Sequence, residues 1–492
     1  MSEKKHECKS PNCSRKFDDK ELELTGKEDK CILHCEKEKG WIDYLLDDIE
    51  RISIKNADSR GRYFWEIIEK EKIRNKDYDF SYVIFPYFID GGIFFDKDAS
   101  YIFEKEVNFA KAIFMANVNF VNIIFEKKVN FKNVVFVEKV RFDKIYFKSG
   151  VDFKHSVFQK KAEFNSLKGA GKLNFEEVII NNKFHIMRLI KDNENIFEIN
   201  FNDSEFFNNA YIEIYYCDLE VLSFRSILNG ADKIVLNRIK INKILQLYDS
   251  NFNNLEVLGL DVTNGKCDFF NISIEKASFT NFQLDNYIDK FVYRGNDDRY
   301  YTRDIMRQFK SVFDRNGNII ESNRFYALEM KEREKELESD LKKGKNFFEW
   351  LIFKIHGISS NHSQDWLLAL FWIIVFGFCF SLIKFYMITE NDKFIHFHIL
   401  SFLGIFLLIL YGVWLNFISK KEGEIKSFFL LFYLYLVYVY ETKDIFLNYF
   451  TSVINPFNKF SNMTLIDLLC KIIIAYLIYQ LIISIRQNTR RK

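Results

Sequence analysis

The chain has 492 residues, and its 70 Lys and Arg against 68 Asp and Glu give a net charge of +2. This length exceeds one ordinary domain, and the near-neutral charge gives no indication of nucleic-acid binding. With 55 Phe and 25 Tyr but only 3 Pro, the composition excludes collagen-like and proline-rich disordered chains.

Residues 1–40 are predicted to form a metal-binding segment. Four of the 8 cysteines lie here, and the candidate ligands are Cys8, Cys13, Cys31, His34 and Cys35. In a reducing compartment such clustering favours metal over disulfides, with ordinary thiols as the alternative. Because His34 and Cys35 can both share a helical face with Cys31, the sequence leaves open which four bind. Four protein ligands leave no position for water, so we expect structural zinc and no catalysis.

Residues 41–79 have a helical apolar pattern. We expect two short amphipathic helices that form an N-terminal cap on the repeat domain that follows. A repeat domain needs such a cap because its first unit otherwise exposes unpaired backbone groups.

Phenylalanine then recurs at gaps that alternate between six and five residues. The positions are Phe103, Phe109, Phe114, Phe120, Phe125, Phe131, Phe136, Phe142, Phe147, Phe153, Phe158 and Phe164. A period of 5.5 residues matches neither an α-helix nor a flat strand. It is typical of a chain that winds in short sides and places one ring into a shared axial core at each side. The ladder predicts a β-solenoid over residues 80–292.

The run from Val107 to Phe120 resembles the pentapeptide-repeat family, in a variant whose unit has eleven residues. The resemblance is strong from Tyr82 to Phe175, fades by Phe282, and implies a right-handed quadrilateral β-helix. It also implies that the residue two positions before each ring faces inward. Ile123, Ile145 and Ser156 are less typical there than the Val and Ala at the other such positions. We expect the added residue to bulge outward at a corner, and Gly169-Ala170-Gly171 to open a loop.

Some members of this family are thought to mimic DNA with an acidic surface. Here residues 101–180 hold fourteen Lys and Arg against nine Asp and Glu, which argues against that role. Almost every aromatic residue is explained as core, so no nucleic-acid partner is expected. Solenoid faces usually bind proteins; we therefore expect an unidentified protein partner, with a purely structural spacer as the alternative.

Residues 293–345 contain two helical patterns separated by a turn at Asp314–Asn318, which predict an antiparallel helix hairpin that closes the second end of the solenoid. Residues 346–362 combine aromatic and aliphatic residues with lysines, which is typical of an interfacial helix on a membrane.

Residues 363–492 are predicted to form an α-helical transmembrane domain with spans at about 366–388, 397–418, 425–440 and 465–485. The third is short and has a core or interfacial helix as its alternative. With four spans, seven basic residues fall on the side of the N-terminal domains and three on the other, which satisfies the positive-inside rule. The charged N-terminus lacks the apolar region of a secretory signal. We expect a multi-pass protein of the bacterial inner membrane with both termini cytoplasmic.

Asp467 and Lys471 are polar residues in the fourth predicted span and, four apart on a helix, can pair. The architecture is similar to bacterial membrane proteins grouped with two-span potassium channels, but residues 441–465 contain no glycine for a selectivity filter. No motif of a common enzyme class is present, so we expect no catalysis. The sequence favours a membrane-anchored scaffold or sensor and leaves open whether it is a homo-oligomer; the alternative is an ion channel or transport-like protein regulated by the solenoid.

Overall fold

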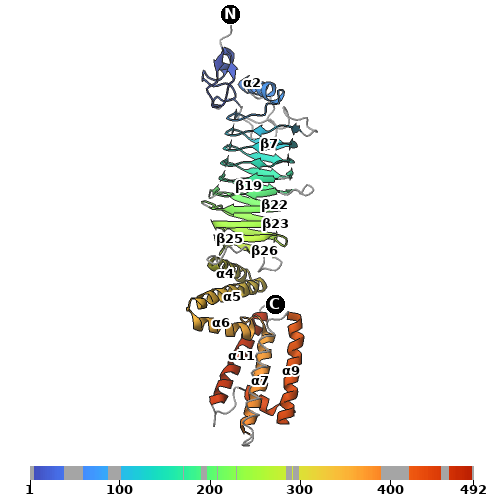
Figure 1. Ribbon diagram of the computed structural model, residues 1–492. Coiled ribbons are helices and arrows are strands. Elements are labelled where there is room, and N and C mark those ends of the chain that lie inside the picture. Colours follow the sequence, from blue (N-terminus) through green and yellow to red (C-terminus); the bar gives the residue numbers. More distant parts are fainter. Residues whose placement is uncertain are drawn as a thin grey trace. The chain divides into compact units, whose positions relative to one another are not determined.

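The computed structural model describes residues 5–37, 41, 59–86, 101–169, 171–189, 197–207, 209–228, 230–283, 291, 299–388, 420–455 and 465–489. The chain divides into two compact units, Met1–Asn316 and Gly317–Lys492. In the first unit, parallel strands stack along one axis into a β-solenoid of about eight turns (Figure 1). The predicted solenoid is therefore confirmed.

Short strands on four sides of the coil form four parallel stacks. The first stack holds β5 (Val107–Asn108), β9 (Val129–Asn130), β13 (Val151–Asp152), β17 (Gly171–Asn174) and β20 (Phe197–Asn200). The second holds β3 (Ile84–Phe85), β6 (Ile113–Phe114), β10 (Val135–Phe136), β14 (Val157–Phe158), β18 (Ile179–Ile180) and β21 (Glu205–Phe206). The third holds β7 (Val118–Val121), β11 (Val140–Asp143), β15 (Ala162–Asn165) and β19 (Lys183–Met187). The fourth holds β4 (Tyr101–Phe103), β8 (Ile123–Phe125), β12 (Tyr146–Phe147) and β16 (Lys168–Gly169).

The later coils have longer strands. They are β22 (Tyr211–Arg225), β23 (Lys233–Asn251), β24 (Leu255–Asp261), β25 (Lys266–Ser273) and β26 (Ser278–Gln283). Strand β22 pairs with both β19 and β20, so one continuous strand replaces two sides of the coil. The 5.5-residue pattern therefore fades where the corner between these two sides becomes part of a strand.

The register of the regular coils places rings above rings. Phe120 pairs with Phe142, and Phe142 with Phe164, so one turn takes 22 residues. The stacked pairs Phe109–Phe131 and Phe131–Phe153 have ring centroids 4.8 and 4.9 Å apart, which matches the spacing of neighbouring strands. All twelve rings of the ladder are buried. The axial space is thus filled by stacked phenylalanines.

A residue with left-handed φ lies two positions after every second ring of the ladder, and also two positions after Phe175. The positions recur every eleven residues and are Lys111, Asn122, Asn133, Lys144, His155, Ser166 and Glu177. At the first of them, the N–H of Ala112 donates to the carbonyl of Phe109 at 3.0 Å, which closes a turn with positive φ at its third residue. The eleven-residue period therefore has a backbone cause.

A polar ladder runs along one corner of the coil. The Nδ2 of Asn130 donates to Oδ1 of Asn108, and that of Asn174 to Oδ1 of Asp152, at 3.0 and 2.9 Å. The same Oδ1 atoms accept the backbone N–H two residues further on, at Ala110 and at Lys154. Each side chain therefore holds its own turn and the neighbouring coil together.

The prediction of a loop at Gly169–Gly171 is wrong. Gly169 ends strand β16 and pairs with Phe147, and Gly171 begins strand β17. A Cβ on Gly169 would lie 2.0 Å from the carbonyl oxygen of Phe147. Glycine here permits a close approach between coils, so it marks the continuation of the solenoid.

Helix α4 (Arg299–Arg315) closes the C-terminal end of the solenoid by packing on β25 and β26. Phe309 stacks on Phe282 with ring centroids 5.9 Å apart. The amide of Gln308 accepts from the N–H of Ile274 at 2.8 Å and donates to the carbonyl of Ile272 at 3.0 Å. A side chain of the helix thus satisfies backbone groups at the open edge of the last coil.

At the N-terminal end lie β1 (His6–Glu7), β2 (Lys16–Phe17), α1 (Asp19–Leu24), α2 (Ser59–Ile67) and the π-helix η2 (Ile68–Ile73). Rings of Phe64 and Trp65 on α2 contact Phe85 of the first coil. Of the two predicted capping helices, most of the first lies outside the described residues.

The second unit is helical. It holds α5 (Ile319–Lys342), α6 (Phe347–Ser360), α7 (Trp366–Ile388), α9 (Lys420–Thr442), α10 (Asn448–Ile454) and α11 (Leu465–Thr489). The two predicted hairpin helices, α4 and α5, belong to different compact units.

The sequence predicts four membrane spans, but the described residues contain only two candidate spans. Two helical segments there are long and apolar enough to cross a membrane, Trp366–Phe385 and Asp467–Gln487. The third predicted span, 425–440, lies in α9, which does not meet this criterion over its described residues. Its polar start and tyrosines lower its hydropathy. The second, 397–418, lies outside the described residues.

Candidate metal centre

Cys8 and Cys13 are positioned by the loop between β1 and β2, which pair in antiparallel fashion. The N–H of Cys8 donates to the carbonyl of Arg15 at 3.1 Å, and that of Cys13 to Ser10 at 3.2 Å. Pro11 and Asn12 form the corner between them, with Asn12 at φ 60°. Pro followed by a residue of positive φ is the signature of a type II turn, which brings the two thiols together.

Cys31 and His34 come from a second tight turn. The N–H groups of His34 and Cys35 both donate to the carbonyl of Cys31, at 2.9 and 3.0 Å. A backbone hydrogen bond of 2.8 Å from Lys9 to Asp29 joins this segment to the first loop. Two ligand pairs from distant segments therefore converge on one point, as in structural zinc sites.

The four potential ligand atoms of Cys8, Cys13, Cys31 and His34 all lie within 4.8 Å of one another. Sγ of Cys13 is 4.0 Å from Sγ of Cys31, while Nδ1 of His34 is 3.2 Å from Sγ of Cys31 and 3.6 Å from Sγ of Cys8. A tetrahedron with metal–sulfur bonds of about 2.3 Å has edges of about 3.8 Å. The spacing fits a tetrahedral ion.

The surroundings also suit a metal. The N–H of Cys31 points at Sγ of Cys8 at 3.3 Å, which stabilises a thiolate. Nε2 of His34 lies 3.4 Å from the carbonyl oxygen of Ser81. A metal-binding histidine usually donates its second ring N–H to such an acceptor, which fixes the tautomer and leaves the other nitrogen free to coordinate.

The protonation of the cluster reflects its crowding. Hydrogen bonds from Cys13 and Cys31 hold the pKa of Cys8 well below its ordinary value. Burial alone would lower the pKa of His34, but the neighbouring thiols of Cys13 and Cys8 raise it to about 9. The negative charge of the Cys8 thiolate is therefore balanced by protons on its neighbours, including the one on His34. A bound cation would displace these protons.

Cys35 does not belong to the cluster. Its Sγ lies 3.6 Å from the carbonyl oxygen of Ile32 and 3.3 Å from Nζ of Lys37, and burial raises the pKa of its thiol. Of the five predicted ligands, the structure brings together four and places the thiol of Cys35 in the surrounding core.

The cluster is connected to the solenoid through its own turn. The N–H of Ile84, in the first coil, donates to the carbonyl of Leu33 at 3.0 Å. Arg15 forms ion pairs with Glu21 and with Glu71 of η2, the latter at 2.8 Å. These contacts were missed from the sequence, because single charged residues and backbone carbonyls give no periodic signal.

The two predicted polar membrane residues lie near the start of α11. Oδ1 of Asp467 is 3.8 Å from Nζ of Lys384 on α7, and Lys471 follows one helical turn later. A cross-helix ion pair thus joins the two candidate spans.

Comparison with protein-family models, with curated proteins and with solved structures finds no match to this chain.

Proposed function

We propose that the protein is a membrane-anchored pentapeptide-repeat protein whose solenoid is a binding scaffold or sensor for another protein. The right-handed winding, the bacterial inner membrane and the cytoplasmic termini belong to this proposal. The observation that carries it is the filled axis of the solenoid: because stacked rings occupy the interior, the unit can act only through its outer faces.

The outer face of the later coils offers apolar contact sites. Phe207 and Leu228 are 43 % and 57 % exposed, and Leu228 forms a bridge to Glu205 of β21. Both therefore lie on the outside of one stack. Exposed apolar residues beside charged ones are typical of protein-binding surfaces.

The second unit supplies the membrane anchor. Besides the two candidate spans, α6 has a polar side and an apolar side. Its Lys354 pairs with Glu334 and Glu338 of α5, at 2.7 and 2.9 Å, whereas Phe348 is 77 % exposed on the other side. A helix with this division is suited to the membrane interface.

The metal is proposed to be structural zinc. Three sulfurs and one imidazole nitrogen are the ligand set that zinc prefers, and a complete set leaves no open position for substrate. Its part would be to fix the N-terminal cap on the first coil.

The scaffold proposal is tested by placing a photo-crosslinking amino acid at Leu228 in the full chain, with the same replacement at Ile102 as control. Both residues are exposed on the solenoid, at 57 % and 47 %. We expect one defined protein to crosslink at position 228 and not at 102. Ion flux through the purified chain in proteoliposomes, without a crosslinked partner, would favour the channel alternative.

A further inference from the structure

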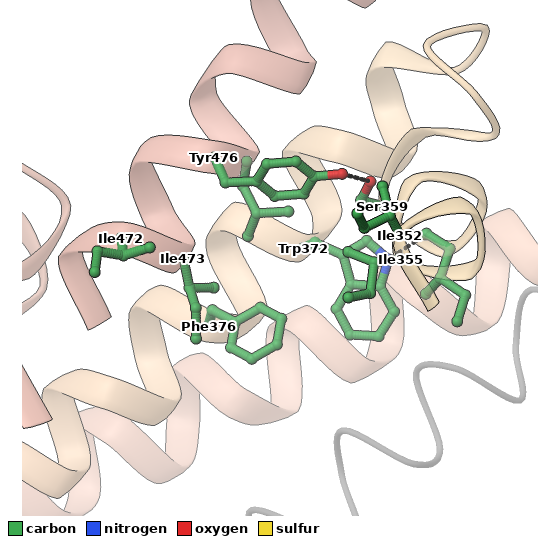
Figure 2. A pocket seen from close by; sticks show the side chains of 10 residues that line it. Ile352, Ile355, Ser359, Trp372, Phe376, Ile472, Ile473 and Tyr476 are labelled. Carbon is green, nitrogen blue, oxygen red and sulfur yellow. Dashed lines mark hydrogen bonds between the residues drawn. The ribbon is translucent and has the colours of Figure 1, made fainter. Parts of the chain in front are cut away.

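A groove of about 570 Å³ lies between α6, α7 and α11 in the second unit (Figure 2). Ile355 of α6, Trp372 and Phe376 of α7, and Ile473 and Tyr476 of α11 contribute to its walls. This volume is within the range of sites that hold small ligands. The walls come from both candidate spans, since Trp372 and Phe376 lie in the first and the α11 residues in the second.

The groove is built on fixed supports. Nε1 of Trp372 donates to the carbonyl of Ile358 at 2.9 Å, which fastens α7 to α6. The buried hydroxyls of Ser360 and Ser363 both donate to Oε1 of Gln480 on α11, at 3.0 Å each. Fully paired polar groups of this kind hold helices in one arrangement. The groove is therefore part of the fold of this unit.

The turn between α6 and α7 adds to this rigidity. Asn361, His362 and Ser363 are three consecutive residues with left-handed φ, at 48°, 55° and 64°. Each costs on the order of 1 kcal/mol for a residue with a side chain and persists only where the surroundings enforce it. The strained backbone of this turn is therefore maintained by the packing of α6 against the two candidate spans.

One pair of polar side chains borders the apolar space. Oγ of Ser359 and the hydroxyl of Tyr476 lie 3.3 Å apart (Figure 2). Oγ of Ser359 donates to the carbonyl of His356 at 3.2 Å, so the hydroxyl of Tyr476 is the one that can turn its proton toward an acceptor in the groove. The chemistry of the site is a long apolar surface with one hydroxyl donor beside it.

The rim of the groove is apolar as well. Ile352, Ile355 and Ile472 are 65 %, 47 % and 57 % exposed. The first two continue the exposed apolar side of α6, which the proposed function places in the membrane interface. An opening with such a rim, in helices that cross the bilayer, faces acyl chains instead of water.

We propose that this groove binds one acyl chain of a membrane lipid, with the hydroxyl of Tyr476 donating to the ester carbonyl next to that chain. The proposal rests on the membrane anchoring of the proposed function. The predicted span 397–418, which lies outside the described residues, is the competing occupant.

The probe is phosphatidylcholine that carries a photoactivatable diazirine on one acyl chain, added to the purified full chain in detergent micelles. We expect saturable labelling that maps to Trp372–Phe376 and Ile473–Tyr476. Ile473→Trp should weaken labelling about tenfold, the loss expected when roughly two methylene groups are excluded. The matched control is Ile478→Trp, because Ile478 is also partly buried against the core of the helical unit but does not line the groove; it should leave labelling unchanged. Tyr476→Phe keeps the ring and should lower labelling severalfold.

Labelling that does not saturate, or that falls equally in Ile473→Trp and Ile478→Trp, would overturn the lipid site. Crosslinks between residues 397–418 and the residues that line the groove would also overturn the lipid site, because the chain itself would then fill the groove. Extraction of membranes with alkaline carbonate separates this result from the larger proposal. A chain that stays in the membrane without saturable labelling disproves only the lipid site, whereas a chain that washes off disproves the anchoring.

Discussion

The two ends of the solenoid are closed by different means. At the C-terminal end one helix, α4, covers the last coil with the ring of Phe309 and satisfies its edge with the amide of Gln308. At the N-terminal end helix α2 contacts the first coil through Phe64 and Trp65, and the segment of residues 5–37 reaches that coil through the turn that carries Cys31 and His34. A 17-residue helix satisfies most of its own backbone, whereas residues 5–37 form only two 2-residue strands, a 6-residue helix and turns. This irregular segment would gain stability from a cross-link, which a metal ion held by Cys8, Cys13, Cys31 and His34 would supply.

The largest expected effect is loss of the N-terminal cap in Cys31→Ser. Structural zinc contributes on the order of 10 kcal/mol to the folding of small domains, so removal of one ligand should leave this segment unfolded. We expect hydrogen exchange to rise sharply over residues 5–37 and at Ile84, while the N–H of Ile274 stays protected. Metal content, measured by mass spectrometry of the native protein, should fall from one equivalent to near zero.

Cys35→Ser is the matched control, because both cysteines are fully buried in the same turn but only Cys31 belongs to the cluster. It should keep one equivalent of metal. Equal metal loss in the two variants would show that the ligands are wrongly assigned.

A smaller effect is expected from Phe131→Ala, in the middle between the ends. Phe131 is fully buried and stacks on rings both above and below, so the change should cost about 3–5 kcal/mol. Because each coil contacts only its neighbours, exchange should rise around residues 109–153 with both caps intact. Exposure of the whole first unit at once would instead show that it unfolds as a single cooperative block.

Gln308→Ala should affect the C-terminal end alone. It leaves the N–H of Ile274 and the carbonyl of Ile272 without their side-chain partner, at a cost of about 1–3 kcal/mol. We expect faster exchange at Ile274 and unchanged metal content. Gln308→Glu is the second variant: it can still accept from Ile274, but its carboxylate would face the carbonyl oxygen of Ile272 and Oδ2 of Asp304, to which Nε2 of Gln308 donates, so exchange should rise at least as much as in Gln308→Ala. If exchange at Ile274 is the same in all three proteins, the packing of Phe309 closes this end without the amide.

The sequence predicts these regions unequally. The ring ladder could be predicted from the sequence because one residue type, phenylalanine, recurs at the inward-facing position. The prediction of a loop at Gly169 was wrong, because a glycine in a loop and a glycine under a close backbone contact cannot be told apart from the sequence. His34 and Cys35 could not be separated, because positions three and four beyond Cys31 are both compatible with a turn. Gln308 gave no signal either, since one polar residue on an amphipathic helix usually faces water. The eleven-residue unit was predicted, but its left-handed position was not, because Lys, Asn, His, Ser and Glu all occupy that position.

The smallest effect is a pH dependence at Asp152, midway along the polar ladder. Burial raises the pKa of this carboxyl, but hydrogen bonds from Asn174 and from the N–H of Lys154, with the ammonium of Lys132, hold it below its ordinary value. The unfolded chain therefore binds the proton more readily than the folded one. The resulting stability is fully present above the ordinary Asp range, near pH 4, and is lost as pH falls through the lower folded pKa.

Hydrogen exchange of residues 131–174 should rise on acidification below about pH 4, without change at Ile274. Asp152→Asn should remove this local dependence, because an amide keeps the acceptor Oδ1 and adds a donor toward Asn130. An equal acid response in both proteins would place the titrating group elsewhere.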